Sequence, residues 1–316
     1  MESISRRLLQ SVKQALPKSA KMCLWLLKII LPCSLIVRLL QYYGIVDHLA
    51  EVLHPLFNFV GLPGATAIVF ITSVFLPLYA AIAVMTSLVM TIREATILTL
   101  MCLVAHNLLV ECAVTKKTGS SFIGMFAFRL IMAFVVANFL NLILPQSYNT
   151  PFMQTVAVVY GDASMVALIE AWLHSSLTLI LTIVLIVTGL MILQRILTEF
   201  DLIKVISRPL RPLMKLFGLP PNSSFLWIVG NVLGLAYGGA LMADMVEEGK
   251  LSLKDSNAVN YHLAISHSLI EDTLLFVALG ISGWIIISTR ILFAVIMVWG
   301  RRLIIVDKCF SKRIKM

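Results

Sequence analysis

The chain has 316 residues, of which 59% are hydrophobic and 13% are charged, and its mean hydropathy is +0.96. A soluble domain usually carries about a quarter charged residues, so this composition excludes an ordinary soluble protein. The formal net charge of +9 comes from short basic clusters between and beyond apolar runs. Such clusters are typical of the charges that set membrane topology, and they argue against a nucleic-acid partner.

The chain begins with a basic, amphipathic segment at 1–21. This segment lacks a small-residue cleavage site, so we interpret it as a helix on the cytoplasmic face rather than as a signal peptide. Two long apolar regions follow, at 22–144 and 175–304, and a polar linker at 145–174 joins them. The last segment, 305–316, is a basic tail that we also expect to be cytoplasmic.

The two apolar regions are predicted to be copies of one unit. HPLFNFVGLP at 54–63 aligns with RPLMKLFGLP at 211–220, and five of the ten positions are identical. Rare polar residues that match in apolar sequence are stronger evidence for a duplication than matched leucines. At a common offset of 161, the matched polar residues are His106 with His267, Glu111 with Asp272, and Arg129 with Arg290.

Each copy is predicted to contain the same five elements in chain order. They are a first apolar span (22–41; 175–197), an amphipathic segment that ends in Gly-Leu-Pro (44–63; 200–220), an interrupted apolar run (64–90; 222–246), a span with a histidine and acidic residues (94–114; 256–279), and a last apolar span (122–144; 282–304). The length and apolar character of the first, fourth and last of these elements predict membrane-spanning helices.

The interrupted run decides the topology. Pro77 interrupts it in the first copy, and four glycines between Gly230 and Gly239 do so in the second. If the run turns back as a re-entrant hairpin, all basic residues outside the spans except Arg93 lie on the cytoplasmic side. If it crosses the membrane, the cluster at 204–215 moves outside, against the positive-inside rule. The sequence therefore favours hairpins and two inverted copies.

The amphipathic run that ends in Gly61-Leu62-Pro63, with its copy at 218–220, and the interrupted run FLPLYAAIAVMTSLVMTIREATIL resemble the nucleoside-recognition or Gate family. This family includes concentrative nucleoside transporters, the membrane part of ferrous-iron transporters and spore maturation proteins. The resemblance covers most of 22–144 and 175–304. It implies an all-α, polytopic membrane protein with two inverted repeats, each with about three transmembrane helices, an interfacial amphipathic helix and a re-entrant hairpin.

Ionisable residues inside the spans are the leading candidates for a substrate site, because each costs a few kcal/mol to place in a bilayer. They are predicted either to line a cavity that binds a solute or exchanges protons, or to hold the two copies together. His267 and Glu271, four residues apart, are expected to share a helix face, whereas His106 and Glu111 can meet one ligand only if their helix is broken. The candidate residues are His106, Glu111, His267, Glu271 and Asp272, with Tyr79, Tyr237 and Asn231 at the interruptions.

Arg129 and Arg290 are expected to pair with Glu111 and Asp272 or with acids of the opposite copy, or else to extend to the membrane surface. A metal site is a weaker alternative, because the cysteines are not repeated. Its ligands would come from Cys102, His106, Glu111, Cys112, His262 and His267. We therefore predict neither a metal nor another cofactor. No hydrolytic constellation is present in the sequence, so an enzyme is not expected.

The leading hypothesis is a secondary transporter of a small polar or anionic solute, with nucleosides among the candidates and a site between two hairpins. A divalent-metal permease and a non-transporting component of an envelope or spore-maturation-like complex remain alternatives. The expected partners are the lipid bilayer and a small solute, with coupling to protons or sodium and a homo-oligomeric state left open. The expected location is a bacterial inner (plasma) membrane with both termini in the cytoplasm.

Overall fold

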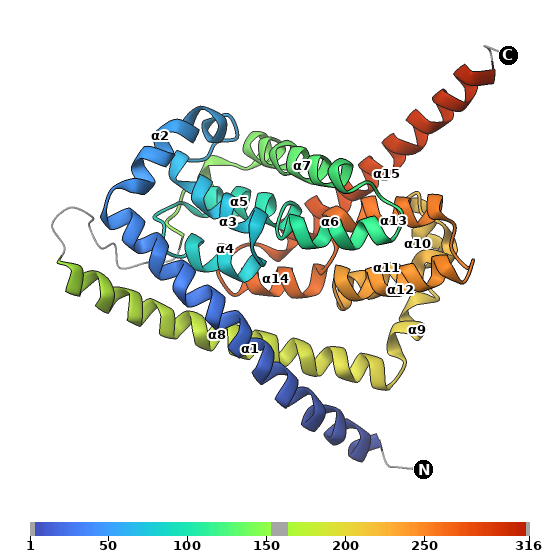
Figure 1. Cartoon of the computed structure of the whole chain (residues 1–316), viewed down its shortest axis with the longest axis horizontal. Helices are drawn as coiled ribbons and strands as arrows, with labels where there is room; N and C mark the ends of the chain where they lie inside the picture. The colour runs from blue at the N-terminus through green and yellow to red at the C-terminus, as the bar shows by residue number, and fades with distance from the viewer. Residues whose placement is uncertain (1–3, 153–163, 314–316) are drawn as a thin grey trace. The chain divides into compact units, whose positions relative to one another are not determined.

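The computed structural model describes residues 4–152 and 164–313 (Figure 1). Within these ranges the chain is helical, with no strand and with one isolated bridge between Thr91 and Pro151. The described residues include five helical segments long and apolar enough to cross a membrane. The all-α, polytopic membrane fold is therefore confirmed. The predicted end segments and the linker each include residues outside the described ranges.

Five long segments are accompanied by shorter helices. The candidate spans are α1 (Ile4–Tyr42), the pair α5 (Ile92–Val104) and α6 (Leu108–Lys117), α7 (Phe122–Ile143), α8 (Met165–Glu199) and most of α15 (Gly283–Arg313). The shorter helices are α2 (Ile45–Asn58), α3 (Ala67–Phe75), α4 (Leu78–Met85), α9 (Leu202–Ser207), α10 (Arg211–Leu216), α11 (Ser224–Val232), α12 (Leu235–Glu247), α13 (Leu253–Ser266) and α14 (Leu269–Val277). Single 3₁₀ turns lie at η1 (Gly64–Thr66), η2 (Gln146–Tyr148) and η3 (Pro221–Ser223).

The helices gather in two compact units, and each unit draws on both predicted repeats. Unit 1 consists of residues 1–108, 130–199 and 273–283. Unit 2 consists of residues 109–129, 200–272 and 284–316. The segment that carries Glu111 and Arg129 therefore belongs to the unit formed mainly by the second repeat.

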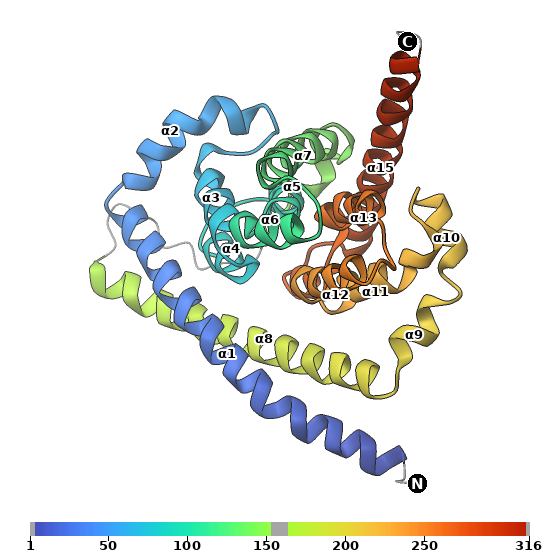
Figure 2. The same cartoon turned by 45° about the vertical axis from the view of Figure 1, so that its right-hand side comes forward.

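Unit 1 contains α1 and α8, which pack together and cross each other (Figures 1 and 2). Arg7 Nη2 lies 3.1 Å from Glu199 Oε1, and Trp172 Nε1 donates a hydrogen bond to Ser34 Oγ at 3.0 Å. Buried positions recur every three or four residues of α1 from Ser11 onwards, so the helix continues through the predicted boundary at residue 21. Helix α8 likewise begins at residue 165, before the predicted residue 175.

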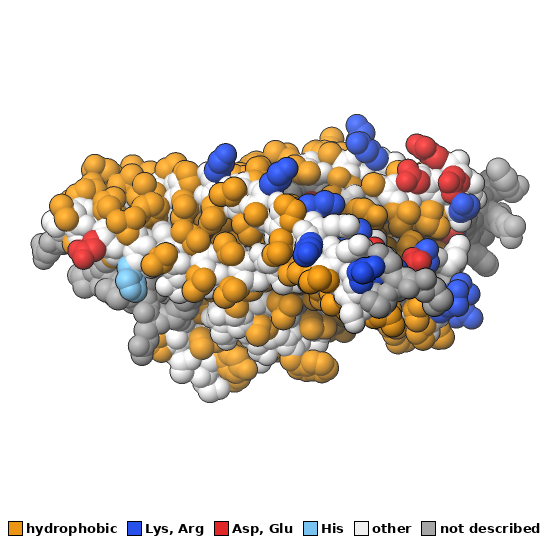
Figure 3. Space-filling model, turned by 90° about the horizontal axis from the view of Figure 1, so that it is seen from below, with side chains coloured by type: hydrophobic (Ala, Val, Ile, Leu, Met, Phe, Trp, Pro, Cys, Tyr) orange, Lys and Arg blue, Asp and Glu red, His pale blue; other side chains and the backbone are white. Residues whose placement is uncertain are grey.

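Helix α8 presents an apolar face to its surroundings. Leu173, Leu177, Leu181 and Leu185 are four residues apart, so they form one stripe along the helix, and each is more than half exposed. Figure 3 shows a face of the molecule on which hydrophobic side chains predominate. Exposed apolar surface of this extent is expected on a protein that contacts lipid. Contact with the bilayer is therefore part of this fold.

Unit 2 has its own apolar core. Its fully buried members include Met214 of α10, Leu226 of α11, Met242 of α12 and Leu263 of α13. Helices α11 and α12 pack against each other on either side of the interruption, as α3 and α4 do in unit 1 (Figure 2). In both units the interrupted apolar run thus forms a pair of packed short helices.

The chain turns at equivalent positions in the two predicted repeats. Gly61 and Gly218 have φ angles of 73° and 72°, which glycine adopts without steric cost. In each case the amide of the following leucine donates to the carbonyl five residues earlier, at 3.0 and 2.7 Å, as in a Schellman motif. Two further pairs with positive φ occur at the offset of 161, namely Asn107 with Ser268 and Gly119 with Gly280.

Candidate functional site

Both helices that carry the predicted histidines and acids are broken. Residues 105–107 separate α5 from α6, and residues 267–268 separate α13 from α14. The residue after each histidine, Asn107 or Ser268, has a left-handed backbone with φ of 48° or 52°. The expectation that His267 and Glu271 share one helix face is therefore wrong, because no continuous helix joins them.

In unit 1 the break after α5 is bound to the interruption between α3 and α4. Pro77 has no N–H, so the carbonyl of Ser73 lacks the donor that a helix would supply four residues later. The N–H of Asn107 donates to this carbonyl at 2.7 Å. A carbonyl in one irregular stretch thus accepts a hydrogen bond from an N–H in the other. Buried backbone groups need such partners where lipid and protein exclude water.

Unit 2 has the same arrangement with glycine in place of proline. Gly234, with φ of 85°, separates α11 from α12. The carbonyl of Gly230, four residues earlier, accepts a hydrogen bond from the N–H of Ser268 at 3.0 Å. A Cβ atom at Gly238 would lie 3.1 Å from Gly230 Cα, so the two short helices approach closely through glycine. Each break therefore has a fixed partner in its own unit.

Three predicted site residues meet inside unit 2. Arg129 Nη1 on α7 donates a hydrogen bond to Glu111 Oε2 on α6. His267 Nε2 lies 3.4 Å from the same carboxylate oxygen. The relative exposures of Arg129, Glu111 and His267 are 1%, 9% and 1%. The carboxylate of Glu111 therefore lies between a permanent cation and an imidazole, away from bulk water.

The hydrogen bonds of His267 define where its proton lies. Its Nδ1 is 2.8 Å from the carbonyl oxygen of Leu263, which can only accept, so Nδ1 carries a hydrogen. The Nε2 atom that faces Glu111 then carries a second proton only when the imidazole is cationic. Without a shared proton, a lone pair would face the carboxylate. Contact between Nε2 and the Glu111 carboxylate is therefore favourable only when a proton lies between them.

Arg290 caps the broken end of α13. Its Nε donates to the carbonyl of Ile265 at 2.7 Å, and its Nη2 donates to the carbonyl of His267. Its Nη1 donates to Asp272 Oδ2 at 3.1 Å, and the residue is fully buried. A helix end leaves carbonyls without partners, and Arg290 supplies donors for two of them. The sequence pointed to the pairing of Arg290 with Asp272 but gave no signal of this second role.

Two buried polar atoms near the interruption in unit 2 have no hydrogen-bond partner among the described residues. They are Asn231 Oδ1 on α11 and His262 Nε2 on α13. The amide nitrogen of Asn231 donates to the carbonyl of Trp227 at 2.8 Å, and Trp227 Nε1 donates to His262 Nδ1 at 3.2 Å. Buried polar atoms are nearly always satisfied, so these two are candidates for contact with a solute.

The remaining predicted residues differ in how far they are buried. His106 is buried in unit 1, where its Nδ1 lies 3.1 Å from the carbonyl oxygen of Cys102. Tyr79 is buried in α4, whereas Tyr237 on α12 is 58% exposed. Glu271 is partly buried on α14.

A polar network that the sequence did not suggest joins α13 to the turn after α6 in unit 2. Asn260 Nδ2 donates to Thr118 Oγ1 at 2.8 Å and to Ser120 Oγ at 2.9 Å. Ser256 Oγ donates to the carbonyl of Thr118 at 2.6 Å. The one sequence feature that could have indicated this network is the group of polar residues in the first turns of the predicted span 256–279. This network fixes α6, and so Glu111, against the helix that leads to His267.

Comparison with known proteins supports the expected family. Residues 23–161 match the family model described as nucleoside recognition, Gate. An uncharacterized membrane protein, YvoD of Bacillus subtilis (strain 168), is 33% identical over 272 residues, which span 85% of this chain and 87% of the relative. No solved structure matches the chain. The chain therefore belongs to the nucleoside-recognition (Gate) family of membrane proteins.

Proposed function

We propose that this protein is a secondary transporter of a small polar or anionic solute, and that the charged cluster of unit 2 forms part of its binding site. The observation that carries the proposal is the buried group of Glu111, Arg129 and His267 beside a broken helix. Charged residues at membrane depth are costly and usually mark a pathway for solutes or ions. Broken helices at such sites present polar backbone to a ligand.

The unsatisfied atoms of unit 2 support binding rather than a purely structural role. Buried polar groups that only held helices together would be expected to satisfy one another, as Arg290 and Asp272 do. Asn231 Oδ1 and His262 Nε2 offer one acceptor and one further polar atom without protein partners among the described residues. A solute with hydroxyl, amide or ring nitrogen groups, such as a nucleoside, matches this chemistry.

The same geometry supports a proposal of coupling to protons. Glu111 and His267 are close enough to share a proton, and Arg129 adds a fixed positive charge. The other charged groups of unit 2 that flank His267 are Arg290 and Asp272, which pair with each other. Loss of the shared proton would change the net charge of the cluster by one. Solute binding and proton binding at one site are then energetically linked.

Uptake into proteoliposomes tests the proposal. A panel of nucleosides and small carboxylates would be offered to the full-length protein with and without an inward acid gradient. We expect the transported solute to accumulate faster with the gradient. The double variant Glu111→Gln/His267→Gln should lose both the gradient dependence and most of the uptake. Retention of wild-type, gradient-dependent uptake in this variant would sink the proposed site.

A matched control is available on α8. Glu170 and His174 are also an acid and a histidine, and both are exposed. The variant Glu170→Gln/His174→Gln should transport as the wild type does. Thermal unfolding of each variant in detergent separates a lost site from a lost fold. Uptake of a divalent cation in place of every organic solute would favour the permease for metals, and no uptake of any kind would favour a non-transporting role.

We further propose that the protein resides in a bacterial inner (plasma) membrane with both termini in the cytoplasm. The support is the distribution of basic residues between the apolar spans. Catalysis of a covalent reaction forms no part of the proposal, because transport requires only binding and a change of access.

A further inference from the structure

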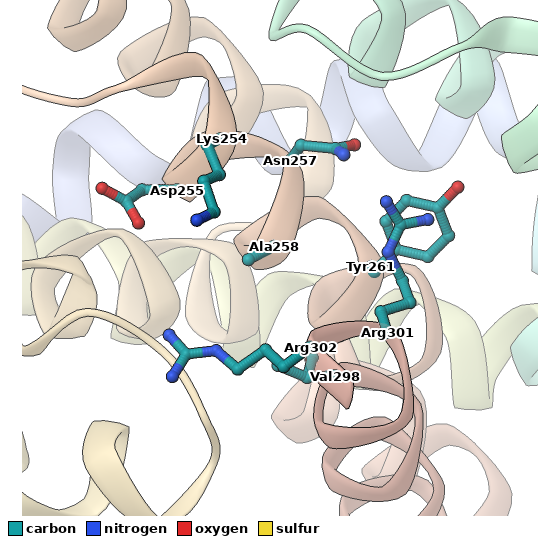
Figure 4. Close-up of a pocket in the computed structure, with 8 residues that line it drawn as sticks. All are labelled: Lys254, Asp255, Asn257, Ala258, Tyr261, Val298, Arg301 and Arg302. Atoms are coloured by element: carbon teal, nitrogen blue, oxygen red, sulfur yellow. The ribbon is translucent and has the colours of Figure 1, made fainter. Parts of the chain in front are cut away.

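A small pocket in unit 2 gathers positive charge between α13 and α15. It has a volume of about 60 Å³, and its lining includes Lys254 and Tyr261 of α13 and Arg301 and Arg302 of α15 (Figure 4). Sites for whole small molecules usually measure roughly 300–1,000 Å³, so this pocket suits one compact polar group rather than a complete solute.

The positive charge of the pocket is not neutralised locally. Among the described residues, none of Lys254, Arg301 and Arg302 forms an ion pair with a carboxylate. The one acidic residue of the lining, Asp255, accepts a hydrogen bond from Ser252 Oγ at 2.8 Å at the start of α13. Three cations thus face one carboxylate that also serves as part of a helix cap. An anion would be attracted to this pocket.

One of the cations is held in a fixed orientation. Arg301 Cζ lies 3.5 Å from the centroid of the Tyr261 ring, so the guanidinium stacks on the aromatic face (Figure 4). Stacking leaves the N–H edge of the guanidinium available, and that edge matches two oxygens of a phosphate group. The pocket therefore presents a preoriented donor fork next to two further positive charges.

The position of the pocket along α15 identifies the source of the anion. The apolar span of this helix runs to residue 303, and Trp299, which is 43% exposed, lies near its end. Tryptophan and basic residues at the end of a span mark the depth of lipid headgroups. On the adjoining face of α15, Leu292 and Ile296 are exposed and lead from this end back into the span. A phosphate held at the pocket would have room for acyl chains along that face.

We propose that this pocket binds the phosphate of an anionic phospholipid. Lys254, Arg301 and Arg302 supply the charge, and the Tyr261 ring fixes the fork of Arg301. The predicted topology places the pocket on the cytoplasmic side, where anionic lipids give the membrane surface a negative potential. This lipid site is separate from the proposed transport site and does not depend on it.

Lipid binding to the full-length protein tests the inference. Short-chain phosphatidylglycerol and phosphatidylcholine with the same acyl chains would be titrated into protein in an uncharged detergent, with thermal unfolding as the readout. Phosphatidylglycerol should raise the unfolding temperature in a saturable way, because a ligand that binds only the folded state stabilises it. Phosphatidylcholine should not. Equal shifts with the two lipids would overturn the proposal.

Substitutions localise the effect. Each cation near an anionic lipid contributes about fivefold in affinity, so Arg301→Ala/Arg302→Ala should raise the phosphatidylglycerol midpoint at least tenfold. Lys116→Ala/Lys117→Ala removes the same charge from exposed positions outside the pocket and should leave the midpoint unchanged. A similar loss in both variants would indicate general surface attraction and contradict a defined site.

Two further arms complete the experiment. If the double arginine variant does not fold, Lys254→Ala alone should raise the midpoint about fivefold, and an unchanged midpoint would contradict the proposal. Inorganic phosphate is the competitor that distinguishes the source of the anion. Millimolar phosphate should not displace the lipid, since it lacks acyl chains, and full displacement by phosphate would assign the pocket to a free oxyanion instead.

Discussion

Arg290 serves the fold and the charged cluster at once. Its guanidinium donates to the carbonyls of Ile265 and His267 and to the carboxylate of Asp272, and none of its surface is exposed. Five donors in a rigid fork allow one side chain to serve a helix end and an acid together. Arg290 therefore holds the backbone at His267 in place, and this role does not require contact with a solute.

Replacement of Arg290 by alanine is expected to destabilise the protein by about 3–5 kcal/mol, because Asp272 would remain buried without its partner. Arg195→Ala is the matched control. Arg195 also pairs with an acid, Glu199 at 3.2 Å, but its side chain is 34% exposed, so its loss should cost less than about 1 kcal/mol. Thermal unfolding in detergent measures both, and equal losses would contradict the structural role of Arg290.

For Asn231 we expect a substitution to affect solute uptake strongly and stability very little. Its Oδ1 has no partner among the described residues, so removal of this buried polar atom offsets the loss of the one hydrogen bond that its Nδ2 donates to the Trp227 carbonyl. Asn231→Ala should therefore leave the unfolding temperature nearly unchanged while it lowers solute uptake at least tenfold. The comparison of unfolding with uptake kinetics checks this. Unchanged uptake would remove Asn231 from the proposed site.

At the scale of elements, the turn that ends the first amphipathic segment depends on Gly61. A Cβ atom there would lie 2.0 Å from Asn141 Oδ1, the same atom that accepts a hydrogen bond from Arg93 Nη2 at 2.7 Å. Arg93 is thus buried and bonded inside unit 1, which agrees with its predicted place apart from the other basic residues.

Gly61→Ala should cost more than Gly249→Ala, although both residues have φ near 70°. The left-handed backbone costs about 1–2 kcal/mol for alanine at either position. No atom lies within 4 Å of a Cβ at Gly249, whereas at Gly61 Asn141 must move, which adds about 1–3 kcal/mol. Unfolding free energies of the two variants test the difference, and equal values would show that Asn141 moves freely.

The sequence predicted the existence of the interruptions better than the extent of the helices around them. Pro77 has no N–H, and Gly234 has a positive φ that glycine adopts without steric cost. Separate helices lie on either side of each residue. The breaks at Asn107 and Ser268 were not predicted, because neither residue is a helix breaker by itself. Their left-handed backbones depend on distant carbonyls, Ser73 and Gly230, which only the folded chain brings near.

At the scale of the whole molecule, the inverted arrangement stays a prediction that labelling can test. Lys204 and Lys250 flank α11 and α12, and their side chains are more than 60% exposed. If these helices form a re-entrant hairpin, Lys204→Cys and Lys250→Cys should both react with an impermeant thiol reagent from the cytoplasmic side. Ser147→Cys, which is also exposed, should react only from the other side.

The native chain is the background control. Among the described residues Cys23, Cys102 and Cys112 are buried and Cys33 is half-buried, so any labelling of Cys33 is measured in it. Reaction of Lys204→Cys and Lys250→Cys from opposite faces would mean that the interrupted run crosses the membrane, and the repeats would then be parallel.

The family, the all-helical fold and the membrane location could all be predicted from composition, spacing and motifs. The two compact units could not, because they do not follow the chain order of the repeats. Residues 109–129 belong with unit 2 and residues 273–283 with unit 1. The assignment of these segments to the other unit depends on side-chain packing after each helix break. No local pattern in either segment predicts it.

The paired backbone bonds also have an evolutionary consequence. A substitution that made α3 and α4 one continuous helix would give the Ser73 carbonyl an internal donor and leave the Asn107 amide without its acceptor. If α5 and α6 instead became one continuous helix, the Asn107 amide would bond within that helix, and the Ser73 carbonyl would lack its donor. Positions 77 and 107 should therefore change together in related chains, as should positions 234 and 268. The two predicted repeats form the same bond with different residues, proline in one and glycine in the other.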